Sequence, residues 1–268
     1  MFVDTCKNVA YNLTLGDLNL KQRTIFWCLS LILISVSTVC AGQELVLHLS
    51  FDALDGKVAK DSSEFGNDAT FKGSPKLIDG VFGKALEFDG KTSGQIPDHS
   101  SLDIVDALTI EFWALVKGGE AIQSGVEKGV AWVSGLYNLA ALYNGGTILQ
   151  FFDLPDACND ENIGPSIQDG EWHFLAGTWD GKTILLYIDG ELEAEMACKG
   201  ELKPNNDPLF IGARGGSGRF LTGALDEIKM YNYALTKAEL LKDMEEPTTL
   251  PVDTQDKLTT VWARLKTN

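Results

Sequence analysis

Short runs of alternating apolar and polar residues, separated by tight-turn dipeptides, are the feature that most constrains this chain. Residues 44–52 (ELVLHLSFD) place four apolar side chains on one face, and residues 107–117 (ALTIEFWALVK) repeat the pattern. A two-residue period over such a length predicts a half-buried β-strand. Asp180-Gly181 and Asp189-Gly190 divide residues 172–197 into three such runs, and Asp-Gly favours hairpin turns. Antiparallel strands joined by hairpins are therefore expected.

The fold class expected from these runs is all-β. Eleven or more short strands with turn signals between them predict a sandwich of two sheets. One helix is expected near the end of the domain, where Thr236-Lys237-Ala238-Glu239 forms a capping box. Apolar residues make up 44% of the chain, which is enough for a sizeable core and too much for disorder.

The pattern of the first 41 residues predicts an export signal. Lys21 and Arg23 flank an apolar run, Thr24–Val39, which is short for a membrane span and is followed by Cys40-Ala41. We predict cleavage after Ala41, with an uncleaved anchor as the alternative, and hence a secreted, cell-surface or periplasmic protein. The folded domain is expected over residues 42–246, and a linker and C-terminal tail over 247–268.

The net charge limits the possible partners, and the cysteine count indicates the redox environment. A formal charge of −16 argues against nucleic acid and anionic membranes, and no stable membrane insertion is expected after signal cleavage. Beyond Ala41 only Cys158 and Cys198 remain. An even count in an exported chain favours a disulfide between them, with two buried free thiols as the alternative.

Asp226 is the candidate metal ligand. Alternation in residues 223–231 (GALDEIKMY) places this carboxylate on the face of Ala224, Ile228 and Met230. A carboxylate on an apolar face costs several kcal/mol unless it is paired or binds a metal. A structural Ca²⁺ would compensate it, with further oxygen ligands from the acidic, turn-rich residues 61–68. In the alternative interpretation, Asp226 accepts backbone N–H bonds from a neighbouring loop.

Seven motifs in order resemble laminin-G-like, concanavalin A-like domains, over about residues 44–242. They are LVLHLSFD (45–52), KDSSEFGNDATFKG (60–73), GKALEFDG (83–90), SLDIVDALTIEFWALVK (101–117), GEWHFLAGTWDGKTILLYIDGEL (170–192), LFIGA (209–213) and GALDEIKMYNYALTKAEL (223–240). The resemblance implies a jelly-roll β-sandwich of two curved antiparallel sheets. It also implies a structural calcium on the convex side, held by Asp226, by Phe51 or Asp52, and by the Gly66-Asn67 turn.

Catalysis is not expected. Retaining glycosidases of this superfamily carry E-x-D-x-x-E on one strand, which supplies two carboxyl groups about 5 Å apart. No run in this sequence presents that set, and no nucleophile elbow, phosphate loop or zinc spacing occurs. His173 lies within a strand pattern and is expected to be a hydrogen-bonded or half-exposed strand residue rather than a catalytic base.

The resemblance instead suggests a binding face. Lectin-like members bind glycans on the concave sheet or its rim, where aromatic rings and polar groups are needed. The candidates are Trp132, Tyr137, Tyr143, Gln150 and Arg214, with core packing as the alternative for each aromatic residue. The expected function is an exported, non-catalytic module that binds carbohydrate or glycoprotein. The alternative is a structural or adhesion domain that binds extracellular protein without a sugar site.

Overall fold

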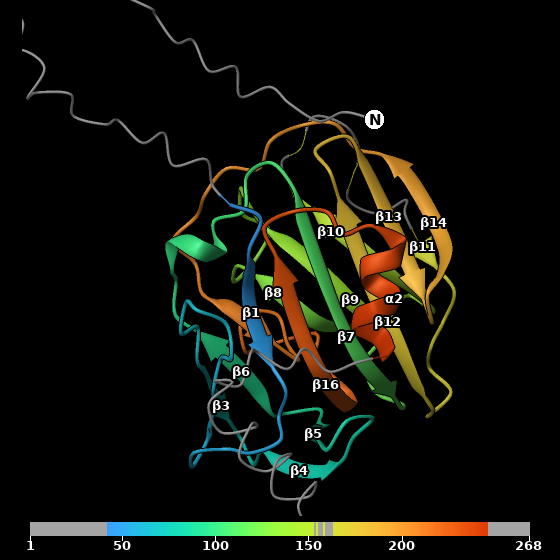
Figure 1. Cartoon of the computed structure of the whole chain (residues 1–268). Helices are drawn as coiled ribbons and strands as arrows, with labels where there is room; N and C mark the ends of the chain where they lie inside the picture. The colour runs from blue at the N-terminus through green and yellow to red at the C-terminus, as the bar shows by residue number, and fades with distance from the viewer. Residues whose placement is uncertain (1–41, 153, 155–157, 159–162, 246–268) are drawn as a thin grey trace, which may run out of the picture. The chain divides into compact units, whose positions relative to one another are not determined.

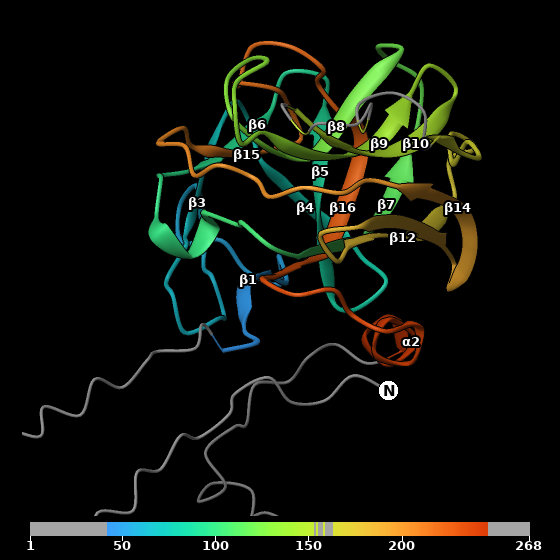
Figure 2. The same cartoon turned by 90° about the horizontal axis from the view of Figure 1, so that it is seen from above.

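Two antiparallel sheets packed face to face form the structure. The computed structural model describes residues 42–152, 154, 158 and 163–245, and Figures 1 and 2 show the two layers. The expected all-β sandwich is confirmed. The predicted signal segment and the 247–268 tail lie outside the described residues. Within those residues, no helix combines the length and apolar character that crossing a membrane requires.

Sheet A has eight strands. In spatial order they are β14 (Glu191–Ala197), β13 (Thr183–Ile188), β12 (Trp172–Trp179), β7 (Leu108–Val116), β16 (Thr222–Tyr231), β5 (Lys84–Asp89) and β4 (Lys76–Asp79), with β1 (Leu45–Leu49) also paired to β16. Strand β16 is therefore hydrogen-bonded to β1, β5 and β7 at different points along its length.

Sheet B also has eight strands. In spatial order they are β11 (Ile163–Gly164), β10 (Gly146–Phe151), β9 (Tyr137–Tyr143), β8 (Ile122–Lys128), β15 (Leu209–Ile211), β6 (Ser93–Ile96), β3 (Ala69–Lys72) and β2 (Val58–Ala59). A 3-10 turn, η2 (Ser100–Leu102), leads from β6 towards β7. The strands alternate repeatedly between the two sheets along the chain, as a jelly roll requires.

One apolar core fills the space between the sheets. Sheet A contributes Leu47, Phe112 and Leu175, and sheet B contributes Leu139 and Leu149, all in one buried cluster. We call these facing surfaces the inner faces, and the opposite surfaces the outer faces. The two-residue period of each strand therefore has the role that the sequence predicted: alternate side chains enter the core.

The meander of β12, β13 and β14 forms as expected. Asp189 and Gly190 adopt positive φ angles of 49° and 78°, and Gly181 one of 80°. Positive φ is sterically allowed for glycine and tolerated by Asp, which is why these dipeptides close the hairpins. Strand β14 lies at the edge of sheet A and carries exposed Glu191, Glu193 and Glu195. Charged side chains at an edge oppose pairing with other chains.

The disulfide prediction is confirmed. Cys158 and Cys198 are bonded, and both are buried in the main core cluster. The backbone of Cys198 is tied to β12 by a hydrogen bond from Trp179 Nε1, 2.8 Å from the Cys198 carbonyl. The disulfide thus joins the segment after β10 to the segment after β14, and its two cysteines are 40 residues apart in sequence.

A β-bulge in β16 overturns one sequence prediction. The inner core cluster contains Leu225, Ile228 and Met230. Residues 225 and 228 are three apart, so strict alternation would put them on opposite faces, and one extra residue must lie between them. The pairing with β7 shifts between Asp226 and Lys229, and Glu227 has a φ of 49°. Uninterrupted alternation, which placed Asp226 on the face of Ile228 and Met230, is therefore wrong. Asp226 faces the outer side of sheet A.

Helix α2 (Lys237–Glu245) packs on the outer face of sheet A, and Figure 2 shows it end-on beyond that sheet. The predicted capping box is present: the Thr236 N–H donates to Glu239 Oε2 at 2.8 Å, and the Glu239 N–H donates to Thr236 Oγ1 at 3.4 Å. Leu240 packs into a second apolar cluster with Phe174 of β12 and Tyr231 of β16. This helix therefore covers a sheet surface that would otherwise face solvent.

Buried charges also lie under α2. Lys229 Nζ is 3.8 Å from Glu111 Oε1 of β7 and 3.6 Å from Asp243 Oδ1 of α2, and the lysine and Glu111 side chains are about 1% exposed. Burial raises the pKa of Glu111 well above its usual value, and Asp243 raises it further, while Lys229 opposes the rise. The Tyr231 hydroxyl donates to the other oxygen of Asp243.

Removing the lysine should be costly. We expect Lys229→Met to lower the free energy of unfolding by about 3 kcal/mol, because Glu111 and Asp243 lose their buried cation. The double variant Glu111→Leu with Lys229→Met should recover part of this loss, since it removes the unpaired carboxylate. Urea denaturation measures both. Lys237→Met is the control, because its ion pair with Glu191 is exposed and should contribute less than about 1 kcal/mol. Equal effects of both single variants would contradict this account.

Candidate functional site

Trp132 is the most distinctive exposed side chain. It lies in the loop between β8 and β9 and is 43% exposed. The guanidinium carbon of Arg214 is 4.3 Å from the centre of its ring, and that of Arg219 is 5.3 Å away. Phe152, the residue after β10, contacts the indole with 5.6 Å between the ring centroids. Cation–π contacts of this kind hold an exposed ring in a fixed orientation.

A glycine-rich hairpin brings the two arginines to this loop. The Arg214 N–H donates to the Gly218 carbonyl at 2.7 Å, closing a tight turn between β15 and β16. Gly215 and Gly216 have φ angles of 56° and 64°. A side chain at Gly215 would begin 2.8 Å from the carbonyl oxygen of Val130, in the loop that carries Trp132. Glycine therefore permits both the turn and the close packing of the two loops.

Buried polar side chains form the floor of this site. Ser124 and Glu127 of β8, Asn138 of β9 and Gln150 of β10 are all fully buried. They lie on the outer face of sheet B, because the neighbours of three of them in sequence, Val126, Leu139 and Leu149, enter the core. The sheet thus presents a polar surface beneath the two loops, held rigid by the β-ladder.

This polar floor is cross-linked by hydrogen bonds. Glu127 accepts from the Ser124 hydroxyl and from Arg214 Nε. Gln150 Oε1 accepts from Asn138 Nδ2 at 2.9 Å and from Arg219 Nη1 at 3.4 Å. Burial raises the pKa of Glu127, and Arg214 opposes that rise. Two buried atoms, Asn138 Oδ1 and Arg214 Nη2, have no hydrogen-bond partner among the described residues. Their hydrogen-bonding capacity is therefore unused by the described residues.

Three of the five predicted binding residues converge here: Trp132, Gln150 and Arg214. Tyr137 was assigned wrongly, because it is 1% exposed, lies in the inner core and donates its hydroxyl to the Leu102 carbonyl at 3.0 Å. Tyr143 is on the outer face but lies in a separate apolar cluster with Ala140 and Ile148. A shift in the β9–β10 pairing reverses the face of Tyr143 relative to Tyr137.

Sequence reasoning missed Arg219, Glu127 and Asn138. Arg219 was recognisable in principle, because the segment RGGSGR (214–219) places one arginine at each end of a glycine-rich turn. Glu127 and Asn138 gave no comparable signal. Glu127 is one of several polar residues in β8, and Asn138 is one polar residue in a mostly apolar strand. Only the pairing of β8 with β9, which sets Glu127 opposite Asn138, brings them together.

Asp226 lies beneath a turn on the outer face of sheet A. Its Oδ2 accepts backbone N–H bonds from Val81 at 2.9 Å and Phe82 at 3.1 Å, as the alternative interpretation expected. Its Oδ1 is buried and has no partner among the described residues. Burial raises the pKa of Asp226 to about 7; the nearby Glu227 also raises it, and the backbone hydrogen bonds oppose the change.

Asp52 approaches the same turn from its other end. The Lys84 N–H donates to Asp52 Oδ1 at 3.1 Å. A Cβ at Gly83 would lie 2.0 Å from Asp52 Oδ1, and one at Gly80 would lie 2.4 Å from Asp226 Oδ2. The two carboxylates therefore pack against one four-residue turn, which the Gly80 N–H closes by donating to the Gly83 carbonyl at 3.1 Å.

The other two predicted metal ligands lie in a different turn. Asn67 Nδ2 donates to the Val46 carbonyl at 2.7 Å and to Ser101 Oγ at 2.9 Å, and the Gly66 carbonyl accepts from the Asp68 N–H. The carboxylate of Asp61 organises this turn by accepting the backbone N–H groups of His48, Ser63 and Asn67. Across the described part of the chain, no three His, Cys, Asp or Glu side chains are grouped closely enough to hold a metal ion.

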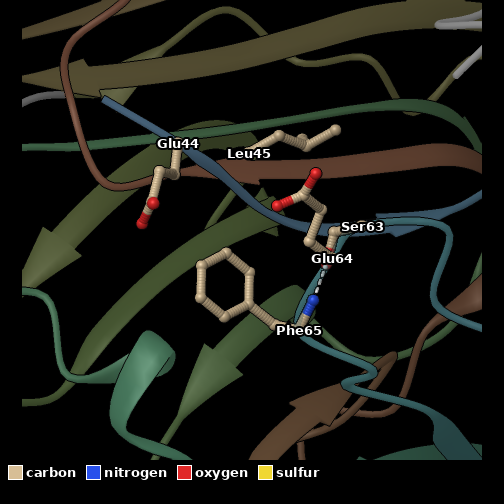
Figure 3. A pocket seen from close by; sticks show the side chains of 5 residues that line it. All are labelled: Glu44, Leu45, Ser63, Glu64 and Phe65. Atoms are coloured by element: carbon tan, nitrogen blue, oxygen red, sulfur yellow. Dashed lines mark hydrogen bonds between the residues drawn. The ribbon is translucent and has the colours of Figure 1, made fainter. Parts of the chain in front are cut away.

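An open pocket of about 240 Å³ lies beside the start of β1. It is lined by Glu44, Leu45, Ser63, Glu64 and Phe65, and Figure 3 shows the two carboxylates and the phenyl ring around it. None of the predicted site residues lines this pocket. Phe65 also makes an edge-to-face contact with His99.

His173 of β12 joins two turns. Its Nδ1 is 2.7 Å from Asp189 Oδ2 and its Nε2 is 3.1 Å from Asp169 Oδ2. Partial burial opposes the charged imidazole, but the bonds to Asp189 and Asp169 outweigh it and raise the pKa of His173. Both ring nitrogens are therefore engaged by carboxylates, which confirms the expected hydrogen-bonded strand histidine.

Comparison with known proteins identifies the family. A sequence model described as the concanavalin A-like lectin/glucanases superfamily matches residues 88–241, more than half of the chain. The chain belongs to the concanavalin A-like lectin/glucanase superfamily. This agrees with the resemblance carried by the seven motifs, and with the two antiparallel sheets.

Two curated proteins match part of this chain at low sequence identity. Pappalysin-1 of Homo sapiens is 25% identical over 211 residues, which is 68% of this chain and 13% of pappalysin-1. The mouse protein is 24% identical with the same coverage. This chain therefore spans only a small part of the curated relatives that it matches.

Among solved structures, domain 4 of AbnA, an extracellular arabinanase from Geobacillus stearothermophilus in complex with arabinotriose, superposes with a TM-score of 0.61. It is 20% identical, and the match covers 75% of this chain and 98% of that domain. The binding domain of Paraclostridial Mosquitocidal Protein 1 superposes with a TM-score of 0.59 at 18% identity, covering 74% of this chain and 51% of the other. A similar fold thus occurs in a domain solved with a bound oligosaccharide and in a toxin's binding domain.

The doubly bonded His173 predicts a pH-dependent stability. Because its pKa is raised in the folded state, its contribution is fully present below the unfolded value of about 6.5 and is lost as pH rises through the folded pKa. We expect the stability difference between wild type and His173→Gln to shrink from pH 6 to pH 9, measured by denaturant midpoints. A difference that stays constant over this range would show that the ring bonds as a neutral imidazole.

Proposed function

We propose that this chain is a non-catalytic carbohydrate-binding module whose glycan site is centred on Trp132. The observation that carries the proposal is an exposed indole, faced by two guanidinium groups, above a buried polar floor. A sugar ring has apolar C–H faces and polar edges. An aromatic ring supplies a surface for the former, and a few fixed polar groups satisfy the latter.

The polar groups of the site are suited to hydroxyl recognition. Asn138 Oδ1 is a buried acceptor and Arg214 Nη2 a buried donor, and neither has a partner among the described residues. A buried polar atom without a partner costs about 1–3 kcal/mol, which a bonded ligand would recover. The arabinanase domain, whose structure includes arabinotriose, supports a glycan ligand by analogy of fold.

The arrangement of acids supports binding rather than hydrolysis. Retaining hydrolysis uses two carboxyl groups about 5 Å apart. Glu127 is the buried carboxylate of this face, and its hydrogen-bonding neighbours are Ser124 and Arg214. A carboxylate that already accepts from a serine and a guanidinium is engaged in holding the site together. We therefore infer that the module has no catalytic activity of its own.

A protein partner is the alternative. The exposed Val130 beside Trp132 extends the apolar surface of the loop, and such a surface suits a protein as well as a sugar. One structural neighbour, the binding domain of a botulinum neurotoxin, is known in complex with rat synaptotagmin II. The glycan test below separates the two functions.

We also propose that the protein is exported and that Asp226 holds a structural Ca²⁺. The basic flank and apolar run before Ala41 support export, as does the disulfide, since such bonds persist in oxidising compartments. Asp226 Oδ1 is a buried oxygen without a partner among the described residues, which suits a hard cation. Asp52 beside the same turn is the second candidate ligand. Gly66 and Asn67 are less suited, because they belong to another turn.

Trp132→Ala tests the glycan site. We expect it to weaken binding to any glycan selected by the wild-type protein at least tenfold, or about 1.4 kcal/mol, because the stacking surface is lost. Isothermal titration calorimetry with ligands chosen from a glycan array measures the change. Leu192→Ala is the control, since Leu192 is equally exposed but lies on the edge of sheet A. Wild-type affinity in Trp132→Ala would exclude this site. If the wild-type protein bound no glycan on the array, a protein partner would be favoured.

Asp226→Ala tests the calcium proposal. In wild type, Ca²⁺ should raise the melting temperature relative to a sample with chelator, and in Asp226→Ala this rise should disappear. The readout is the calcium-dependent shift, because the substitution also leaves the Val81 and Phe82 N–H groups without their acceptor. Asp106→Ala, at an exposed carboxylate, is the control and should keep the shift. A wild type whose melting temperature ignores Ca²⁺ would refute the proposal.

A further inference from the structure

Both arginines of residues 42–246 contact the same exposed tryptophan. Arg214 and Arg219 are the two arginines in that part of the sequence, and each guanidinium lies within 5.3 Å of the centre of the Trp132 ring. The whole chain carries a formal charge of −16. In so acidic a protein, two guanidinium groups at one exposed aromatic side chain form a local exception that calls for a physical explanation.

Support of the indole does not by itself account for two arginines at this site. An arginine has a planar fork of five N–H donors that matches a carboxylate in two-point geometry, and it remains charged at all relevant pH values. Arg214 uses Nε to hold Glu127, which leaves Nη2 buried and without a partner among the described residues. A charged donor in that state is costly unless an acceptor arrives.

The charges around the indole are balanced. Two cations, Arg214 and Arg219, face the buried carboxylate of Glu127 and the exposed carboxylate of Glu120, whose Oε2 accepts from the Arg219 backbone N–H at 3.1 Å. The cations lie at the rim, where Arg214 is 13% exposed, whereas the Glu127 side chain is fully buried beneath them. A ligand approaching the indole would therefore meet the guanidinium groups before the buried carboxylate of Glu127.

We propose that the Trp132 site selects saccharides that carry an anionic group, either the carboxylate of a uronic acid or a sulfate ester. This inference rests on the proposed glycan-binding function and names the ligand class of the same site. The sugar ring lies against the indole, and the anion accepts hydrogen bonds from Arg214 Nη2 and from the guanidinium of Arg219. Neutral sugars that stack equally well lack this second interaction.

The overall negative charge does not prevent such recognition. Charges separated by more than the Debye length, about 8 Å at physiological ionic strength, are largely screened. A charge-assisted hydrogen bond forms at about 2.8 Å, well inside that length. Long-range repulsion should therefore slow the approach of an anionic glycan, while the contact with the two arginines decides the affinity.

Matched ligands test the proposal. Calorimetry on the mature protein would compare an oligogalacturonate with its full methyl ester, which has the same backbone without the charge, and a sulfated galacto-oligosaccharide with its unsulfated form. We expect at least tenfold tighter binding to one anionic member than to its neutral partner. The pair that shows the preference distinguishes a carboxylate from a sulfate.

The outcomes separate this inference from the function on which it rests. Equal affinity for charged and neutral members would overturn the anion preference and leave a neutral glycan site intact. If none of the four ligands bound and the wild type also bound nothing on a glycan array, the glycan-binding function itself would fail. Anion preference that persists in Trp132→Ala would place the anion elsewhere and overturn the proposal for this site.

Variants assign the preference to the arginines. Arg219→Gln should reduce the ratio of charged to neutral affinity to within about threefold of one. Lys182→Gln makes the same charge change on the hairpin between β12 and β13 of the other sheet and should keep the wild-type ratio. Arg214→Gln alone would leave the buried carboxylate of Glu127 without its cation. Arg214 is therefore tested in a double variant, Glu127→Gln with Arg214→Gln, which removes both charges of the buried pair. Circular dichroism confirms folding. A wild-type ratio in both arginine variants would overturn the proposal.

Discussion

A single extra residue in β16 determines how the rest of sheet A is built. The bulge at Asp226 and Glu227 lets both Leu225, which precedes it, and Ile228, which follows it, enter the same core. Strand β16 meanwhile stays paired with three strands. Without it, one of these apolar segments would face outwards. The positive φ of Glu227 is the local strain that this solution requires. Asp226 consequently faces outwards, beneath the Gly80–Gly83 turn.

The bulge also explains why the outer face of sheet A carries so many buried charges. Glu227 pairs with His48 of β1 at 2.6 Å, and Lys229 lies between Glu111 and Asp243. Each of these groups loses its hydration and depends on its neighbours to recover that free energy. The covering elements, α2 and the turn above Asp226, are therefore integral to the sheet, and this face serves internal structure.

Sheet B divides its faces differently. Its inner face supplies apolar side chains to the core, and its outer face supplies buried polar groups from three rigid, neighbouring strands. Two loops then add the indole of Trp132 and the guanidinium groups of Arg214 and Arg219. Side chains held by a β-ladder lose little entropy on binding, and variable loops above them adjust specificity. This division is consistent with a superfamily fold shared by binding domains with little sequence identity.

The sequence by itself determined the strands, the Asp-Gly hairpins, the capped helix and the Cys158–Cys198 bond, because each depends on local periodicity, turn chemistry or a count of residues. Of the candidate site, it predicted Trp132, Gln150 and Arg214. Only the tertiary structure decided that Tyr137 enters the core, that Asp226 faces outwards, and that Arg219 joins Arg214 at Trp132. The physical reason is cross-strand register: a bulge reverses every side chain beyond it, and its position depends on the partner strand, which local periodicity does not encode.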